Sequence, residues 1–171
     1  MDLTDIATVG KWEEFEQAIH DRCGMNACVY NIQGTRVTSY VGWANEVCPK
    51  IKAYPEGIAA ICAVANQYFG KELAETKKPL IDECDAGFVK FAVPIVVKGE
   101  FLGTVGGCGH LLNGSEVETF LIEKAIGKGD LGLDKKINTV KTITDTEVNE
   151  MVVYVQDYLD GIVDPENWTT C

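Results

Sequence analysis

The sequence lacks any apolar run near the roughly 18 residues that a membrane-spanning helix needs. Its first residues, from Met1 to Asp5, are acidic and have neither the basic nor the apolar region of a secretory signal peptide. We therefore expect a cytoplasmic protein that has no membrane partner.

Positive charge is also scarce in this chain. It contains 15 Lys and Arg residues against 26 Asp and Glu residues, which gives a net charge of −11 at pH 7. Such a surface repels the phosphate backbone, so direct binding of nucleic acid is not expected. The glycine-rich stretch 103–109 lacks the Lys-Ser/Thr pair of a P-loop, which disfavours a phosphate cradle.

What the sequence does contain is an ordinary globular composition, with 46% hydrophobic residues in a chain of 171. A chain of this length buries about 70% of the surface that its unfolded form exposes, so one hydrophobic core stabilises it without disulfides or metal. The sequence has no internal repeat and no interdomain linker. We predict a single domain over residues 1–171, with its core at about residues 10–162.

Three stretches have apolar residues at helical spacing. The first covers residues 11–23 and is followed by Gly24, a typical C-cap. The second runs over residues 58–73 and places Cys62 on its buried stripe. The third covers residues 145–162 and begins at a capping box. Its expected inward residues are Val148, Met151, Val152, Val155, Leu159 and Ile162.

A shorter helix is predicted after Ser115, because Ser115 and Glu118 have the spacing of a capping box. Its inward residues are predicted to be Val117, Phe120 and Leu121. The polar stretch 127–143 is expected to be a loop or irregular.

The β-prone runs 27–32 and 35–41 predict a hairpin. Pro94 cannot donate to a ladder, so its strand is expected to lie at an edge or to be bulged there. Further strands are expected at residues 79–83, 88–97 and 101–108. The pattern predicts an α+β fold, in which helices flank a mostly antiparallel sheet and a pocket lies between them.

Seven cysteines are an odd number in a domain too large to need stapling, which favours thiols or thiolate ligands over disulfides. Four of them could converge at one end of the sheet and hold zinc or an iron–sulfur cluster: Cys48, Cys62, Cys84 and Cys108. Their spacing contains no CxxC motif, and the alternative is that each packs as a small apolar residue. That alternative fits Cys23 and Cys28, and Cys171 is expected to be a tail thiol without a role.

Cys108 and His110 are two residues apart, so on a continuing strand both would point to one face. A Cys/His nucleophile pair, assisted by Asp85, is therefore an alternative to be tested. The carboxylates of Asp82 and Glu83 are expected to be solvated.

The segment from Cys84 to Ile95, CDAGFVKFAVPI, followed by GEFLG at 99–103 and by Gly106-Gly107, resembles the PocR sensory-domain family. In that family a Cys-His-Ala-Gly-Leu element leads into a strand that ends in Pro-Ile, and a glycine pair follows the next strand. Cys48-Pro49 and Cys62 are similar to the two upstream cysteines of the family. The resemblance covers about residues 10–160.

Two residues depart from the family pattern. Asp85 stands where the family usually has His, which replaces a switchable donor and acceptor with an acceptor-only carboxylate. Cys108 stands after the glycine pair, where Gln is common, and adds a fourth thiol.

The resemblance implies a PAS-like or GAF-like ligand-sensing fold that serves as the input module of bacterial signalling proteins and transcription regulators. It also implies that the ligands are small hydrocarbon derivatives such as short diols.

We therefore expect a non-catalytic sensory domain that binds a small molecule or a Cys-ligated metal or iron–sulfur cofactor. The helix over residues 145–162 would relay the bound state to a signalling output protein, and a homodimer is expected by analogy. The expected ligand-binding residues are Asp85, Phe88, Phe91, Val93, Val105 and Gly107, with the four thiols Cys48, Cys62, Cys84 and Cys108 as metal ligands. The alternatives are a cysteine-dependent enzyme using Cys108 and His110, and a protein-binding scaffold.

Overall fold

The computed structural model describes residues 1–167. The α-helices are α1 (Leu3–Ile6), α2 (Val9–Cys23), α3 (Val47–Lys52), α4 (Pro55–Gly57), α5 (Ala63–Thr76), α6 (Thr119–Ile126), α7 (Leu133–Lys136) and α8 (Asp145–Val163). A π-helical turn, η1 (Ile58–Cys62), joins α4 to α5, and two 3-10 turns are η2 (Ile137–Thr139) and η3 (Pro165–Asn167). The strands are β1 (Asn26–Asn31), β2 (Leu80–Glu83), β3 (Val89–Val97), β4 (Glu100–Leu112) and β5 (Thr142–Ile143).

The strands form one mostly antiparallel sheet in the order β1-β4-β3-β2. The short β5 pairs in parallel with the end of β4, where Leu111 lies opposite Thr142. The α+β fold with a mostly antiparallel sheet and flanking helices is therefore confirmed.

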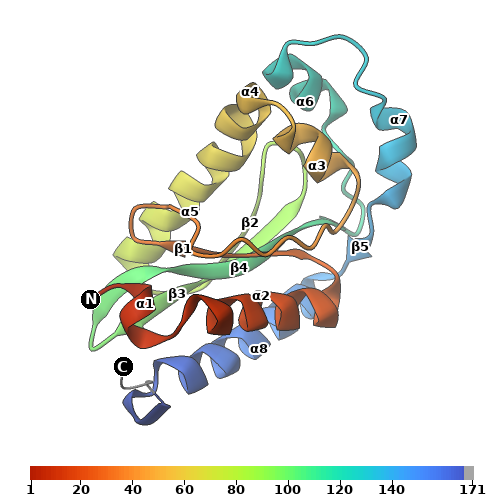
Figure 1. Cartoon of the computed structure of the whole chain (residues 1–171). Coiled ribbons are helices and arrows are strands. Elements are labelled where there is room, and N and C mark those ends of the chain that lie inside the picture. Colours follow the sequence, from red (N-terminus) through yellow and green to blue (C-terminus); the bar gives the residue numbers. More distant parts are fainter. Residues whose placement is uncertain (168–171) are drawn as a thin grey trace.

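Helices cover the two faces of the sheet differently. The long helices α2 and α8 lie side by side along one face, whereas α5 crosses the other face, with α3 and α4 at its end (Figure 1). Successive side chains of β3 point to opposite faces of the sheet, as in any strand. Phe91 and Val93 pack with Trp12 of α2 and Val155 of α8, while Ala92 packs with Phe69 of α5.

The two long helices on the first face follow the predicted pattern closely. Helix α2 ends at Cys23, and Gly24 then adopts the left-handed conformation with φ 72°. Helix α8 begins with a reciprocal capping box, in which Thr144 and Glu147 each accept from the other's backbone N–H. All six residues predicted to face inward on α8 are buried.

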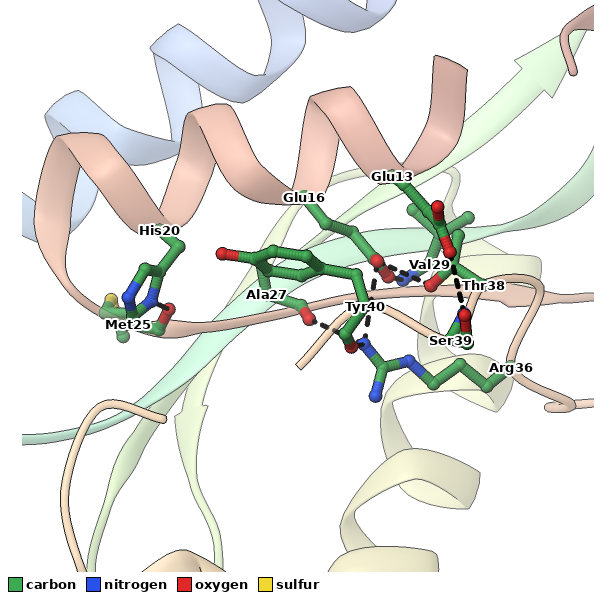
Figure 2. Close-up of polar contacts among 10 residues, drawn as sticks. All are labelled: Glu13, Glu16, His20, Met25, Ala27, Val29, Arg36, Thr38, Ser39 and Tyr40. Carbon is green, nitrogen blue, oxygen red and sulfur yellow. Dashed lines mark hydrogen bonds and ion pairs between the residues drawn. The ribbon is translucent and has the colours of Figure 1, made fainter. Parts of the chain in front are cut away.

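The predicted strand over residues 35–41 is wrong, because only one isolated bridge, between Tyr30 and Arg36, follows the turn after β1. This segment instead directs its polar groups at α2 and β1 (Figure 2). The Thr38 hydroxyl donates to the buried Glu16 carboxylate at 2.5 Å, and the Arg36 guanidinium donates to the carbonyls of Ala27 and Tyr40. These side-chain contacts replace a strand ladder.

The short helix α6 begins later than predicted and buries other residues. Ser115 does not cap it, because the Ser115 hydroxyl donates to the Glu83 carboxylate at 3.4 Å. The helix starts at Thr119, and its buried residues are Ile122 and Ile126. Phe120 is 70% exposed, so its predicted inward position is wrong. Leu121 is 41% exposed as well, while Val117 packs against the cluster of buried residues that includes Ile122 and Ile126.

The connection over residues 127–143 contains α7, η2 and β5, so it is more regular than predicted. Pro94 lies in β3 beyond the last β2 pair, Leu80 with Ala92, and beside a register shift between Ile95 and Val96. A residue without an N–H is tolerated at such an irregular position. Among residues 1–167, no helix is long and apolar enough to cross a membrane.

Candidate functional site

A cavity of about 50 Å³ lies between the sheet and the segment that runs from α3 through η1 to α5. Its wall includes five of the six described cysteines: Cys28, Cys48, Cys62, Cys84 and Cys108. All five are free thiols. We call this space the thiol-lined cavity. It contains the four cysteines that the sequence singled out and one that it did not.

The strands form the floor of the thiol-lined cavity, because their side chains alternate between the two faces of the sheet. Asn26, Cys28 and Tyr30 occupy every second position of β1 and all line the cavity, whereas Ala27 and Val29 are buried in the core of the other face. The register places Asn26 opposite Cys108 and Cys28 opposite Gly106 of β4. Lys90 of β3 lies on the other side of Cys108.

The roof of the cavity comes from the helical segment opposite the sheet. Cys48 and Ile51 belong to α3, and Cys62 is the last residue of the π-helical turn η1. A π-turn inside a helix widens the backbone and is frequently found at functional sites. The sequence pattern of an ordinary helix did not reveal it.

Two buried asparagines fix the positions of two thiols. The Asn45 carbonyl accepts from the backbone N–H of Cys48 at 2.7 Å, and its amide donates to the Cys48 sulfur at 3.4 Å and to the Gly109 carbonyl at 2.7 Å. The Asn26 amide lies 3.8 Å from the Cys108 sulfur. These contacts tie α3 to β4 at the edge of the cavity.

Burial favours the neutral form of four thiols of the cavity, those of Cys28, Cys48, Cys62 and Cys84. It raises the pKa of Cys84 from an ordinary value of 9.0 to about 11. Burial also raises the pKa of Cys28, Cys48 and Cys62. The neighbouring Cys108 adds to the increase in the pKa of Cys48 and Cys84. These thiols are therefore protonated near neutral pH, unlike the thiolates of reactive cysteines.

We expect the protein to lose stability in alkali because of these raised pKa values. A thiol whose pKa is higher in the folded than in the unfolded state stabilises the fold below the unfolded value, and this contribution is lost as the pH rises through the folded value. For Cys84 the window is about pH 9 to 11, and the loss is at most about 1.4 kcal/mol per pH unit. Urea denaturation across this window should give a shallower decline for Cys84→Ser than for the wild type. If the stability of both proteins declines equally with pH, the raised pKa of Cys84 is contradicted.

Cysteines that line one cavity form a metal site only if several of them lie close enough to bind the same ion. Within residues 1–167, no three His, Cys, Asp or Glu side chains are grouped in a way that could hold a metal ion. The geometry thus offers no direct support for zinc or an iron–sulfur cluster on Cys48, Cys62, Cys84 and Cys108.

The other predicted ligand-binding residues are distributed over both faces of the sheet. Phe88 lines the thiol-lined cavity. Phe91, Val93 and Val105 lie instead in the core beneath α2 and α8. A side chain at Gly107 would meet the Phe91 ring, so Gly107 also faces that core, and Asp85 is exposed.

Cys108 and His110 do not face each other, which corrects the predicted nucleophile pair. Cys108 pairs with Lys90 and His110 with Val89, so Gly109 is an extra residue, with φ 104°. Because neighbouring residues of a strand point to opposite faces, the bulge separates the two side chains. The His110 ring nitrogen Nε2 lies 2.8 Å from the Cys23 carbonyl on the α2 side.

Sequence reasoning missed several polar residues of the cavity: Asn26, Tyr30, Lys52, Asn66 and Lys90. Cys28 was assigned to packing, although its alternation with Asn26 and Tyr30 gave a signal. Cys23 does pack against the core, and Cys171 lies outside the described residues.

A larger hollow adjoins the thiol-lined cavity on its solvent side. This outer pocket has a volume of about 560 Å³ and shares four wall residues with the cavity: Tyr30, Lys52, Cys62 and Asn66. It lies between α5 and the turn after β1, which includes Gln33 and Gly34. The shared wall residues place the two hollows next to each other.

Comparison with known proteins gives two matches. The model of a family described as the sensory domain found in PocR matches residues 5–166. The chain is also 26% identical over 106 residues to the regulatory protein PocR of Salmonella typhimurium, an alignment that covers 62% of this chain and 33% of that protein. The chain thus aligns with about a third of the length of that relative. No solved structure matches.

Proposed function

Since this chain belongs to the family of PocR sensory domains, we propose that it binds a small effector in the thiol-lined cavity and passes the bound state to a signalling output protein. The whole of residues 1–171 then acts as one input module.

The observation that carries this proposal is the composition of the cavity wall. Strands β1, β3 and β4 meet α3, η1 and α5 there, together with the turn between β2 and β3. Most small-molecule sites combine apolar walls with a few convergent polar groups, and this wall has both. An effector that touches so many elements stabilises one arrangement of them over others.

The route from the cavity to α8 is short, because a single sheet separates them. Lys90 and Cys108 face the cavity, while Phe91 and Val105 of the same strands pack beneath α8. Helix α8 contacts β3 and β4 directly. An effector that binds one sheet geometry more tightly shifts the population towards it and moves the surface on which α8 rests.

The test is to measure the thermal midpoint and the amide hydrogen exchange of α8 with propane-1,2-diol and with sodium propionate. We expect at least one probe to raise the midpoint and to slow exchange in α8. Cys62→Leu, which fills the cavity, should abolish both effects, whereas Cys23→Leu, which replaces a thiol outside the cavity, should retain them. If neither probe changes either reading in the wild type, the proposal is overturned.

A cysteine-ligated metal or iron–sulfur cluster is the second candidate. Five thiols line one cavity, although within residues 1–167 no three of them are grouped to hold a metal ion, so a cluster would require them to move together. Reconstitution with iron and sulfide without oxygen, followed by absorption spectroscopy and metal analysis, tests it. Visible absorption that is lost in Cys48→Ser would support the cluster. A colourless, metal-free protein would dismiss it and leave the organic effector standing.

A further inference from the structure

The walls of the thiol-lined cavity and of the outer pocket have an unexpected charge. They contain three lysines, Lys52, Lys71 and Lys90, and no Asp or Glu among the described residues. The chain as a whole has a net charge of −11. A hollow whose charged wall residues are all cations, in an acidic protein, concentrates positive potential where the effector would bind.

Lys90 is the most deeply placed of these cations. It lies on β3, in the interior of the sheet, and the residue is only 9% exposed. Its ammonium lies 5.3 Å from the centre of the Phe69 ring. Within residues 1–167 its ammonium forms no ion pair and no hydrogen bond. A charge on a largely buried residue is normally paired, so an ammonium without an ion pair at the wall of a cavity leaves a place for an anionic partner.

The nearest candidate partner within the sheet is engaged elsewhere. Asp82 of β2 lies opposite Lys90 in the register. Its carboxylate accepts instead from the Tyr68 hydroxyl at 3.2 Å and from the Glu83 backbone N–H at 2.8 Å. Asp82 is exposed and does not line the cavity.

Lys52 stands where the cavity meets the outer pocket. It lines both spaces, is half-buried, and its ammonium lies 5.3 Å from the centre of the Trp43 ring. An anion that moves inward from the outer pocket would pass Lys52 before it reaches Lys90.

We propose that the effector carries a negative charge and is a small carboxylate whose oxygens pair with Lys90. This inference rests on the proposed function of the same cavity. A carboxylate supplies the missing partner of the ammonium, and the Asn26 and Asn66 amides offer further donors nearby. The volume of about 50 Å³ admits a head group of a few heavy atoms, and the outer pocket has room for the rest of the molecule.

Calorimetric titration with sodium propionate, propionamide, propane-1,2-diol and inorganic phosphate tests the charge. Propionate and propionamide have the same shape but differ in charge. We expect propionate to bind at least tenfold more tightly than propionamide, and Lys90→Met to weaken propionate binding at least tenfold. Lys78→Met makes the same charge change at an exposed residue outside both hollows and should leave binding unchanged.

A second reading separates lost binding from lost folding. Without probe, Lys90→Met should melt at a higher temperature than the wild type, because an apolar side chain replaces a charge that has no ion pair on a largely buried residue. If that variant does not fold, Lys52→Met takes its place and should weaken propionate binding severalfold.

Each outcome decides one of the two proposals. Equal binding of propionate and propionamide, or of propionate to Lys90→Met and wild type, overturns the carboxylate while the sensory cavity stands. Phosphate binding as tightly as propionate assigns the charge to an inorganic anion and overturns the carboxylate. Tight propionate binding without any change in α8 exchange overturns the relay and leaves the carboxylate site in place.

Discussion

Replacing Glu16 by alanine is expected to lower the free energy of unfolding by about 3–5 kcal/mol. The Glu16 side chain is fully buried in α2 and collects three partners (Figure 2). It accepts from the Val29 backbone N–H at 2.7 Å and from the Thr38 hydroxyl at 2.5 Å, and it lies 3.5 Å from the Arg36 guanidinium. Alanine leaves all three without that acceptor, and a buried donor without a partner bears its full desolvation cost. Urea denaturation near neutral pH measures the loss.

Two further variants separate the network from helix propensity. Glu16→Gln keeps an acceptor for Val29 but removes the charge next to Arg36, so it should lose less stability than Glu16→Ala. Glu14→Ala, on the exposed side of the same helix, should have little effect, because its ion pair with Lys11 is a surface pair. If Glu16→Ala and Glu14→Ala unfold at the same urea concentration, the buried network does not hold residues 35–41 in place.

The sign of the pH dependence gives an independent check on Glu16. Burial raises the pKa of its carboxyl above the ordinary value of 4.5. A raised folded pKa means that the folded state binds the proton more tightly, so this group favours the fold below pH 4.5 and that contribution is lost as the pH rises through the folded value. The same decline should be absent from Glu16→Gln.

The Glu16 network also explains why the strand prediction for residues 35–41 failed. The β-prone residues of this stretch predict a strand, and the side chains of Arg36 and Thr38 both point at Glu16. Glu16 lies on helix α2, however, and no local sequence pattern indicates that one carboxylate of an amphipathic helix is buried. The amphipathic helices α2 and α8 needed no such partner, because their periodicity alone defines the buried face.

The sequence pointed to the cysteines that line the candidate site but not to its lysines. Cys48, Cys62, Cys84 and Cys108 were expected to meet at one end of the sheet, and all four line one cavity. The faces of individual strand residues depend on register, which one bulge reverses. Gly109 is such a bulge, so His110 faces the opposite side from Cys108. Lys90 could not be assigned to a cavity, because its surroundings come from strands and helices distant in sequence.

Replacing Gly106 by alanine is the other substitution with a large expected effect, and it tests how closely the sheet packs at the cavity floor. A Cβ at this position would lie 2.0 Å from the Phe91 carbonyl oxygen and 2.8 Å from the Ala92 Cα. Both atoms are backbone of β3, so they can move only if the β3–β4 ladder shifts. We expect the free energy of unfolding to fall by about 3 kcal/mol, at the upper end of typical overpacking effects. Urea denaturation measures this change, and propionate titration should show weaker binding.

Gly161→Ala provides the matched control, because it makes the same chemical change where, within residues 1–167, the added Cβ has no heavy atom within 4 Å beyond its chain neighbours and the backbone of its own helix. Gly161 lies inside α8, and alanine there should raise the free energy of unfolding by about 0.5–1 kcal/mol through helix propensity. If Gly106→Ala lowers the free energy of unfolding and Gly161→Ala raises it, the loss of stability at Gly106 is due to contact with β3. Equal stabilities would mean that β3 and β4 can separate at little cost. In that case the strands at the floor of the cavity can move, and the ligand would select one of several cavity conformations instead of binding a preformed one.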